Sequence, residues 1–329
     1  VGDEVAYHLT DSDAKAFVVW EDLLKPGLRG FNQVDTCRHL FFVRTNAPTL
    51  PFHYGEMERH GQEKVKDGSR AIDFERACSA ADSECDMAQT MPDDTAVILY
   101  TSGTTGASKG VELTHFNMYS NAQWVSERMW SQPSTSQIEF LGPGHVSLAA
   151  LPLSHAFGQT MMQNALLFNG GALSYLLRFT PEDACRAIER DRVTVFAGVP
   201  TMYLALLNFP DADRYHLGSL KYCICGGAPM SVEAMRAFEK KYNVSVLEGY
   251  GLTETSPLAV TNRTFRPKKP TSIGLPITGV DVKIFDERDG EVPRGESGEI
   301  VIRGPNVMKG YYKHPQATAA VMRHGWFHT

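Results

Sequence analysis

Short apolar runs alternate with segments of helical periodicity along most of the chain, and this alternation constrains the fold more than any other feature. Strands are expected at residues 16–20, 96–100, 146–151, 172–176, 193–197, 220–225 and 244–247. Helices are expected at residues 72–81, 114–130, 181–190, 200–207 and 231–242, with one more after residue 157. Because helical crossovers join parallel strands, the rhythm predicts an α/β fold with parallel sheets flanked by helices on both faces.

The pattern changes after about residue 270. Short apolar runs at 280–285 and 299–303 are separated by turn sequences, among them Asp289-Gly290. Closely spaced strands with such turns are typical of antiparallel β-structure. We therefore expect an α/β region over residues 1–270 and a small antiparallel or barrel-like β subdomain over residues 271–329.

The bulk properties exclude several classes of protein. The 329 residues are 43% hydrophobic and 21% charged, with a formal net charge of −6, and the sequence has no basic block of the kind that nucleic-acid binders carry. No apolar stretch has the length of a transmembrane helix, and the N-terminal residues carry no signal-peptide core. The six cysteines, none in a CxxC pair, are Cys37, Cys78, Cys85, Cys185, Cys223 and Cys225. These properties predict a cytoplasmic protein with reduced thiols.

A loop rich in glycine, serine and threonine follows the strand expected at 96–100. It begins with Thr101, Ser102, Gly103, Thr104, Thr105 and Gly106 and ends at Lys109 and Gly110. The glycines let the backbone present N–H groups, the hydroxyls add donors and Lys109 adds a positive charge, and together these suit a polyphosphate. The spacing is not that of a Walker A loop, because Ser108 precedes the lysine. A flexible linker is the simpler alternative, but a linker is not expected between a buried strand and a helix.

This loop resembles the phosphate loop of the acyl-adenylate-forming (AMP-binding) enzymes, the superfamily of acyl-CoA synthetases, firefly luciferase and nonribosomal peptide adenylation domains. Ser108 stands where the family usually has proline. Further segments match in the family's order, at residues 151–158, 225–229, 249–254, 298–304 and 325–329, while residues 1–95 match only weakly. The stretches 248–257 and 304–312 are most similar to those of fatty acyl-CoA synthetases.

The resemblance implies that a carboxylate attacks the α-phosphate of ATP, with Mg²⁺ and hydrogen-bond donors offsetting the repulsion between the two anions. Glu254 would hold Mg²⁺, since carboxylates suit this hard cation. Thr253 would bond the α-phosphate or the acyl carbonyl oxygen. Lys109, with Thr104 and Thr105, would hold the β- and γ-phosphates.

The same resemblance assigns residues to the base and to the acyl group. Tyr250, followed by Gly251, would stack on adenine. The turn against adenine would consist of Gly226, Gly227, Ala228 and Pro229. The acyl pocket would contain Phe157, Met202, Thr255 and His155, with Met161, Met162 and Val199 as apolar neighbours. Of these residues, His155 would also act in catalysis. Each residue alone has a simpler interpretation, such as an exposed carboxylate for Glu254, but the ordered set favours a functional site.

The stretch 154–158 contains no acidic residue, whereas amino-acid-activating relatives carry an aspartate there for the substrate ammonium. An unpaired buried charge is costly, so an uncharged acyl tail is favoured. We expect activation of a medium- or long-chain fatty acid and transfer to CoA, with ATP, the acid and CoA as partners and no nucleic acid. The alternatives are an aryl-acid (coumarate-type) CoA ligase and an acyl-AMP ligase that loads a carrier protein. A luciferase-like oxygenase would share every motif, while the intact Lys109, Thr253 and Glu254 argue against a non-catalytic module.

The family pattern extends past the end of this sequence. Residues 325–329 match a block that continues in the family to Gly-Asp, whose aspartate clasps the ribose. A hinge and a small mobile C-terminal domain then follow in the family, with a lysine that contacts the reacting groups. We therefore expect a fragment of a larger ligase, with the mobile C-terminal domain absent, that is weakly active or inactive on its own.

Overall fold

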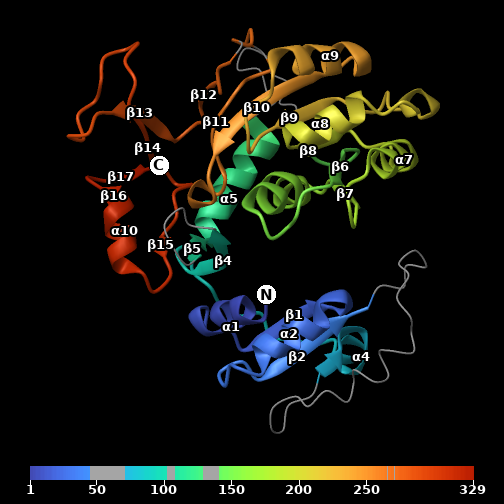
Figure 1. The fold of residues 1–329 in the computed structure, drawn as a ribbon, viewed down its shortest axis with the longest axis vertical. Coiled ribbons are helices and arrows are strands. Elements are labelled where there is room, and N and C mark those ends of the chain that lie inside the picture. Colours follow the sequence, from blue (N-terminus) through green and yellow to red (C-terminus); the bar gives the residue numbers. More distant parts are fainter. Residues whose placement is uncertain (45–70, 102–107, 129–140, 265, 270) are drawn as a thin grey trace. The chain divides into compact units, whose positions relative to one another are not determined.

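The computed structural model describes residues 1–44, 71–101, 108–128, 141–264, 266–269 and 271–329 (Figure 1). Its contacts divide the chain into two compact units, Val1–Thr90 and Met91–Thr329. Strand β12 (Leu275–Pro276) continues the main sheet of the second unit past residue 270. The functional division expected at residue 270 stays a prediction.

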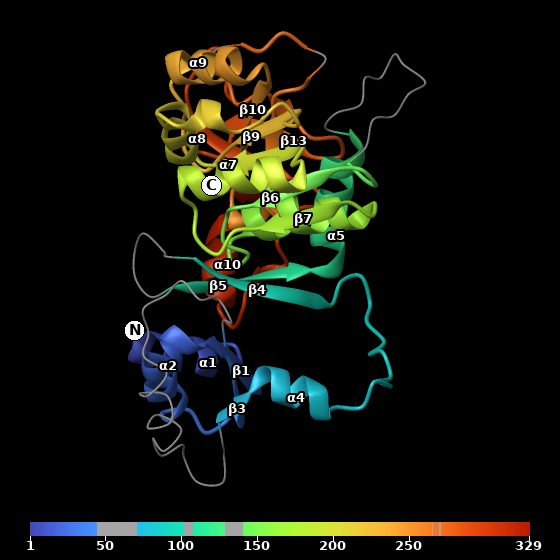
Figure 2. The same cartoon turned by 90° about the vertical axis from the view of Figure 1, so that its right-hand side faces the viewer.

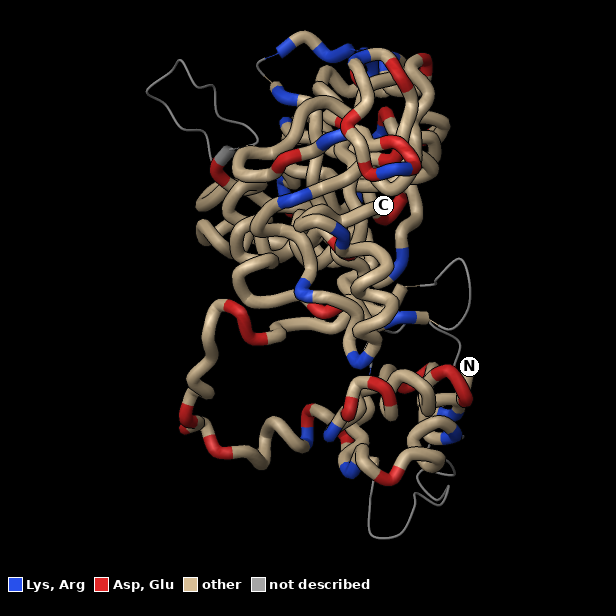
Figure 3. The backbone as a smooth tube through the Cα atoms, turned by 90° about the vertical axis from the view of Figure 1, so that its left-hand side faces the viewer, with Lys and Arg blue, Asp and Glu red and all other residues tan. Residues whose placement is uncertain are grey.

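Charged residues of both signs are interspersed along the chain (Figure 3). Exposed pairs such as Arg186–Glu182 join neighbouring opposite charges, and pairs of this kind contribute little to stability. Across the described ranges, no helix combines the length and apolar character that crossing a bilayer requires.

The first unit is a three-stranded parallel sheet with the order β1-β2-β3. Its elements are α1 (Gly2–Asp11), β1 (Ala16–Trp20), η1 (Glu21–Leu23), α2 (Leu24–Phe31), β2 (His39–Val43), β3 (Ala71–Asp73) and α4 (Phe74–Ala80). The core packs Leu9 of α1 and Leu28 and Phe31 of α2 with Leu40 of β2. The strand expected at 16–20 and the helix expected at 72–81 are confirmed in type, whereas α1, α2, β2 and β3 were not predicted.

The second unit is built on a seven-stranded sheet with the order β12-β11-β10-β9-β8-β6-β7. Its strands are β6 (Val146–Ala149), β7 (Ala172–Tyr175), β8 (Val195–Gly198), β9 (Tyr222–Cys225), β10 (Ser245–Gly251), β11 (Leu258–Thr261) and β12. The five strands from β10 to β7 run parallel, and β11 and β12 add antiparallel neighbours. The expected parallel sheet is confirmed.

Helices cover both faces of this sheet (Figures 1 and 2). One face carries α7 (Pro181–Asp191), α8 (Pro200–Leu207) and α9 (Val232–Tyr242), and the other carries α5 (His115–Gln123), the π-helical segments η2 (Trp124–Arg128) and η3 (Phe157–Asn164), and α6 (Ala165–Phe168). A short turn, η4 (Ala212–Arg214), follows α8. In β9, Tyr222 and Ile224 belong to one core while Cys223 and Cys225 belong to the other, because successive side chains of a strand point to opposite faces.

Local sequence explains where several helices begin. The Thr180 hydroxyl accepts a hydrogen bond from Asp183 N at 3.0 Å, and Pro181 occupies the first turn of α7. Ser231 caps α9 in the same way. Such caps satisfy N–H groups that have no partner within the helix, so they favour the start of each helix at this position.

A strand that the sequence analysis did not predict lies between the glycine-rich loop and the helix expected at 114–130. The loop joins β4 (Thr95–Thr101) to β5 (Lys109–Thr114), and these strands pair antiparallel in a small sheet with the order β15-β5-β4, where β15 is Gly310–Tyr311. Val111 and Leu113 are completely buried and alternate with Glu112. This is the period of two that a strand requires, and helix α5 starts only at its end.

The remaining sheet is antiparallel, with the order β13-β14-β17-β16. It contains β13 (Asp281–Phe285), β14 (Glu299–Arg303), β16 (Met322–Arg323) and β17 (Trp326–His328), and helix α10 (Pro315–Val321) precedes β16. The small antiparallel β region expected near the C-terminal end is confirmed.

Candidate functional site

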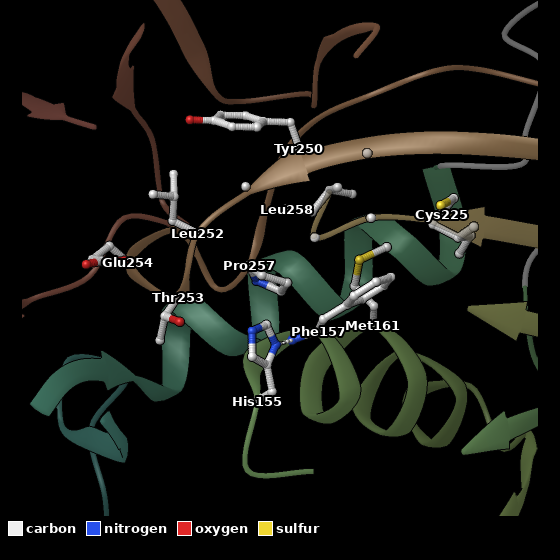
Figure 4. A pocket seen from close by; sticks show the side chains of 15 residues that line it. His155, Phe157, Met161, Cys225, Tyr250, Leu252, Thr253, Glu254, Pro257 and Leu258 are labelled. Atoms are coloured by element: carbon white, nitrogen blue, oxygen red, sulfur yellow. Dashed lines mark hydrogen bonds between the residues drawn. The ribbon is translucent and has the colours of Figure 1, made fainter. Parts of the chain in front are cut away.

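A cavity of about 290 Å³ lies where the parallel strands β9 and β10 end. Three segments line it, drawn from residues 155–161, 224–227 and 249–258. Figure 4 shows Tyr250 on one side, His155 on the opposite side and Glu254 at one end. Ligands of open α/β sheets commonly bind at the carboxyl ends of the strands, so the position itself marks this cavity as the candidate site.

The wall after β9 depends on two glycines. A Cβ on Gly226 would lie 3.1 Å from Cε1 of Phe157, and Gly227 has a φ of +81°, which favours glycine. Next to them, burial and the nearby Glu248 carboxylate raise the pKa of Cys225 to about 12. The Cys225 thiol is therefore neutral, and its side chain packs in the core on the other face of the sheet. Ala228 and Pro229, predicted with this turn, are exposed just beyond it.

The π-helical segment η3 supplies the apolar floor, and His155 lies just before it. Phe157 and Met161 of η3 are buried and face the cavity. The Nδ1 atom of His155 accepts a hydrogen bond from Phe157 N at 3.1 Å, drawn as a dashed line in Figure 4. Nδ1 is thus an acceptor, so the neutral ring carries its hydrogen on Nε2. His155 can present that N–H to a bound group.

The motif after β10 forms the opposite wall. Tyr250 and Gly251 complete the strand, while Thr253 and Glu254 lie in the 3₁₀ turn η5 (Thr253–Thr255). All four residues line the cavity. Thr255 is completely buried, and its hydroxyl accepts a hydrogen bond from Leu252 N at 2.9 Å. It closes the turn and does not line the cavity.

Met202, the other predicted acyl contact, is partly buried between the two cores of the sheet. Like Thr255, it is not among the residues that line this cavity. The assignment of both residues to the substrate stays a prediction.

Glu254 has a partner that the sequence did not suggest. The Tyr311 hydroxyl donates a hydrogen bond of 2.8 Å to Oε1 of Glu254. Burial and the Glu254 carboxylate hold the pKa of Tyr311 well above its ordinary value, so the phenol remains protonated. On the ring of the same tyrosine, the Lys109 ammonium lies 4.9 Å from the centroid. The structure therefore brings the predicted lysine and glutamate together through Tyr311.

Buried asparagines fix the segment that carries Tyr311. Asn306 is 1% exposed, and its Nδ2 donates to the carbonyls of Thr255 and Leu258 at 3.0 Å each. Asn117 of α5 donates to the carbonyls of Pro305 and Val307. The segment 304–312 is thereby tied to the turn that holds Glu254. In the sequence, this segment had indicated only a similarity to fatty acyl-CoA synthetases.

The glycine-rich loop begins at Thr101 and ends at Lys109, which pair across the β4–β5 hairpin. Its other predicted phosphate contacts, Ser102, Gly103, Thr104, Thr105 and Gly106, lie outside the described residues. Lys109 is placed by the strand pair, which fixes its backbone opposite Thr101.

A magnesium ion would find one carboxylate here, that of Glu254. Among the described residues, no group of three or more His, Cys, Asp or Glu side chains is placed to hold a metal. Mg²⁺ commonly binds through one or two carboxylates together with substrate phosphates and water. The donor set thus fits an ion that arrives with a nucleotide and does not fit a metal held by protein ligands alone.

The fold and the cavity define an α/β protein with a cavity at the carboxyl ends of two parallel strands. The sequence matches the AMP-binding enzyme family over residues 2–312. The chain therefore belongs to this family, and the resemblance stated from the motifs is confirmed.

Individual relatives agree with this assignment. The chain is 38% identical over 237 residues to a long-chain-fatty-acid–CoA ligase of Bacillus subtilis (strain 168), which covers 72% of this chain and 41% of that protein. It is 37% identical over 251 residues to a feruloyl-CoA synthase of Amycolatopsis sp, covering 76% of this chain and 49% of that protein. The crystal structure of apo MatB from Rhodopseudomonas palustris superposes with a TM-score of 0.80 at 28% identity, over 100% of this chain and 58% of that one. The chain thus spans less than half the length of these two curated relatives.

Proposed function

We propose that this chain carries the ATP- and acid-binding site of an AMP-forming acid–CoA ligase. The observation that supports it most is the single cavity in which the apolar side chains of η3 meet the segment Tyr250–Glu254. An acyl tail requires the former, and the reacting phosphate and its cation require the latter. Membership of the AMP-binding family is consistent with both.

The proposed chemistry joins the carboxylate of the acid to the α-phosphate of ATP. In this proposal the Thr253 hydroxyl donates to the α-phosphate or to the acyl oxygen, and Lys109 neutralises the β- and γ-phosphates until pyrophosphate leaves. Tyr250 stacks on adenine. Mg²⁺, held through Glu254, would supply further positive charge to the phosphates. His155 would present its Nε2–H to the carboxylate from the opposite wall.

The apolar walls favour an uncharged acyl tail. Phe157, Met161, Ile224 and Leu258 line the cavity, and its one carboxylate, Glu254, lies at the end next to Tyr311. We propose a medium- or long-chain fatty acid, since methionine adapts to flexible chains and the Bacillus subtilis relative is a long-chain-fatty-acid–CoA ligase. An aromatic acid is the second candidate, because similarity to a feruloyl-CoA synthase is almost as high.

The proposal predicts that non-hydrolysable acyl-AMP analogues stabilise the chain against thermal unfolding, and that the shift grows from acetyl to dodecanoyl. Because a ligand of the folded state stabilises it by RT ln(1 + [L]/Kd), each tenfold gain in affinity adds about 1.4 kcal/mol. Thr253→Ala and Tyr250→Ala should reduce the shift at every chain length. Tyr175→Ala, at an exposed tyrosine outside the cavity, is the matched control.

A benzoyl or feruloyl analogue that stabilises more than every alkyl analogue would favour the aromatic candidate. No shift with any adenylate, on a cooperatively folded chain, would contradict the proposed site. The acceptor is tested separately, by offering CoA or a carrier protein to the acyl-adenylate. Transfer to the carrier protein alone would contradict a CoA ligase.

A further inference from the structure

Tyr311 touches both charged groups of the proposed site. Its hydroxyl donates to Glu254 Oε1 at 2.8 Å, and its ring face holds the Lys109 ammonium 4.9 Å from the centroid. We propose that Tyr311 is a positioning residue that holds Lys109 and Glu254 apart and oriented for a magnesium–triphosphate ligand. This inference rests on the proposed function, because it assigns the phosphates to Lys109 and the cation to Glu254.

The position of Tyr311 is fixed by its own strand. β15 pairs antiparallel with β5, which places Tyr311 opposite Val111 in the hairpin that carries Lys109. The Tyr311 N–H donates to Thr318 Oγ1 at 2.9 Å, and the residue is 9% exposed. The preceding Met308 N–H donates to the Glu254 carbonyl at 2.8 Å. Backbone hydrogen bonds of this segment therefore join it both to the hairpin that carries Lys109 and to the turn that carries Glu254.

The hydrogen bond selects how Glu254 can bind a cation. Because Oε1 already accepts a hydrogen bond from the phenol, Oε2 is the less engaged oxygen and would be the one to hold a cation. Mg²⁺ requires near-octahedral geometry and keeps several waters, and a single-oxygen ligand leaves room for them. A hydrogen bond to a charged acceptor is roughly twice as strong as one between neutral groups, so the phenol restrains the carboxylate rotamer.

The ring also keeps the two charges from neutralising each other. Within the described part of the chain, Lys109 and Glu254 form no ion pair, and the ammonium rests on the face of the ring. A direct ion pair would have to break before phosphate or metal could bind. The cation–π contact keeps the ammonium close to the site without engaging the Glu254 carboxylate, so the lysine can move onto an arriving phosphate.

The test is a magnesium titration of nucleotide binding to the 329-residue chain. Tyr311→Phe removes the hydroxyl and keeps the ring, Tyr311→Leu removes both, and Tyr175→Phe is the control at an exposed tyrosine. The probe is α,β-methylene-ATP, with AMP in the absence of metal as the reference ligand. Tyr311→Phe should raise the Mg²⁺ concentration for half-maximal binding about tenfold, as is typical for loss of a partner of a metal ligand. AMP binding should not change.

Two further variants separate the contacts. Tyr311→Leu should also weaken metal-free binding of the triphosphate relative to AMP, because Lys109 loses its support. In a Glu254→Gln background, Tyr311→Phe should not shift the Mg²⁺ titration further, because the carboxylate that it orients is gone.

Three results would overturn the inference. A Tyr311→Phe titration that superimposes on that of the unsubstituted chain would exclude the role. Equal weakening of AMP and triphosphate, independent of Mg²⁺, would reduce Tyr311 to a packing residue. If the unsubstituted chain bound neither nucleotide, the proposed function would fail and this inference would fail with it. The first two results would overturn the inference alone, because in both of them the unsubstituted chain still binds nucleotide. The decision rests on Tyr311→Phe, which keeps the packing of the ring.

Discussion

A Gly251→Ala variant is expected to lose acyl-adenylate binding by about 100-fold or more, equivalent to about 2.8 kcal/mol. A Cβ at this position would lie 1.7 Å from the carbonyl oxygen of Pro257 and 3.1 Å from the Cα of Leu258. The carbonyl is held by a hydrogen bond from the Thr255 hydroxyl, so it cannot move aside alone. The wall of the cavity between Tyr250 and Thr253 must therefore shift.

The same substitution should lower the free energy of unfolding by about 1–3 kcal/mol, as overpacking commonly does. The matched control is Gly218→Ala, because Gly218 is exposed and an added Cβ would meet nothing within 4 Å. Analogue binding is measured by calorimetry at a temperature where both variants are folded, and unfolding by urea titration. Unchanged affinity in Gly251→Ala would show that the backbone here is not part of the binding wall.

The second large effect is expected from Asn306→Asp, which should destabilise the chain by about 3–5 kcal/mol at neutral pH, the range found when a buried charge is left unpaired. The Asn306 amide donates to two carbonyl oxygens, those of Thr255 and Leu258. A carboxylate has nearly the same shape but only accepts hydrogen bonds, so it would face both carbonyls without a donor. Asn306→Leu removes the donor without adding charge and is the control.

The pH dependence separates these two variants. Burial beside carbonyl oxygens disfavours the ionised form, so the pKa of the introduced aspartate is raised in the folded chain above its unfolded value. A group of this kind favours folding below its unfolded pKa, and that contribution is lost as pH rises through the folded pKa. The free energy of unfolding of the Asn306→Asp variant should therefore fall relative to that of Asn306→Leu as pH rises. Urea unfolding at pH 5 and 8 measures the difference, and parallel behaviour of the variants would contradict the buried placement of Asn306.

Much of the architecture could be predicted because it depends on local patterns. The apolar runs at β8 and β9 are short and bounded by helical segments, and Thr180 and Ser231 mark where α7 and α9 begin. Strand β5 was missed because its first residues, Lys109 and Gly110, were assigned to the glycine-rich loop, which left only residues 111–113 before the expected helix. The motif segments around His155, Gly226 and Tyr250 were found by resemblance, and the fold places all three at one cavity.

The sequence by itself determined the α/β class and the antiparallel end region, because periodicity, caps and turn residues act over a few neighbouring positions. The segments that line the cavity were indicated by the resemblance of their motifs to those of a family. Only the tertiary structure decided that Tyr311 bonds Glu254, 57 residues away, and that Asn117 holds a carbonyl 188 residues away. It also placed Thr255 behind the cavity wall and Met202 between the two cores. Strand order and register bring these residues together, and no local pattern encodes them.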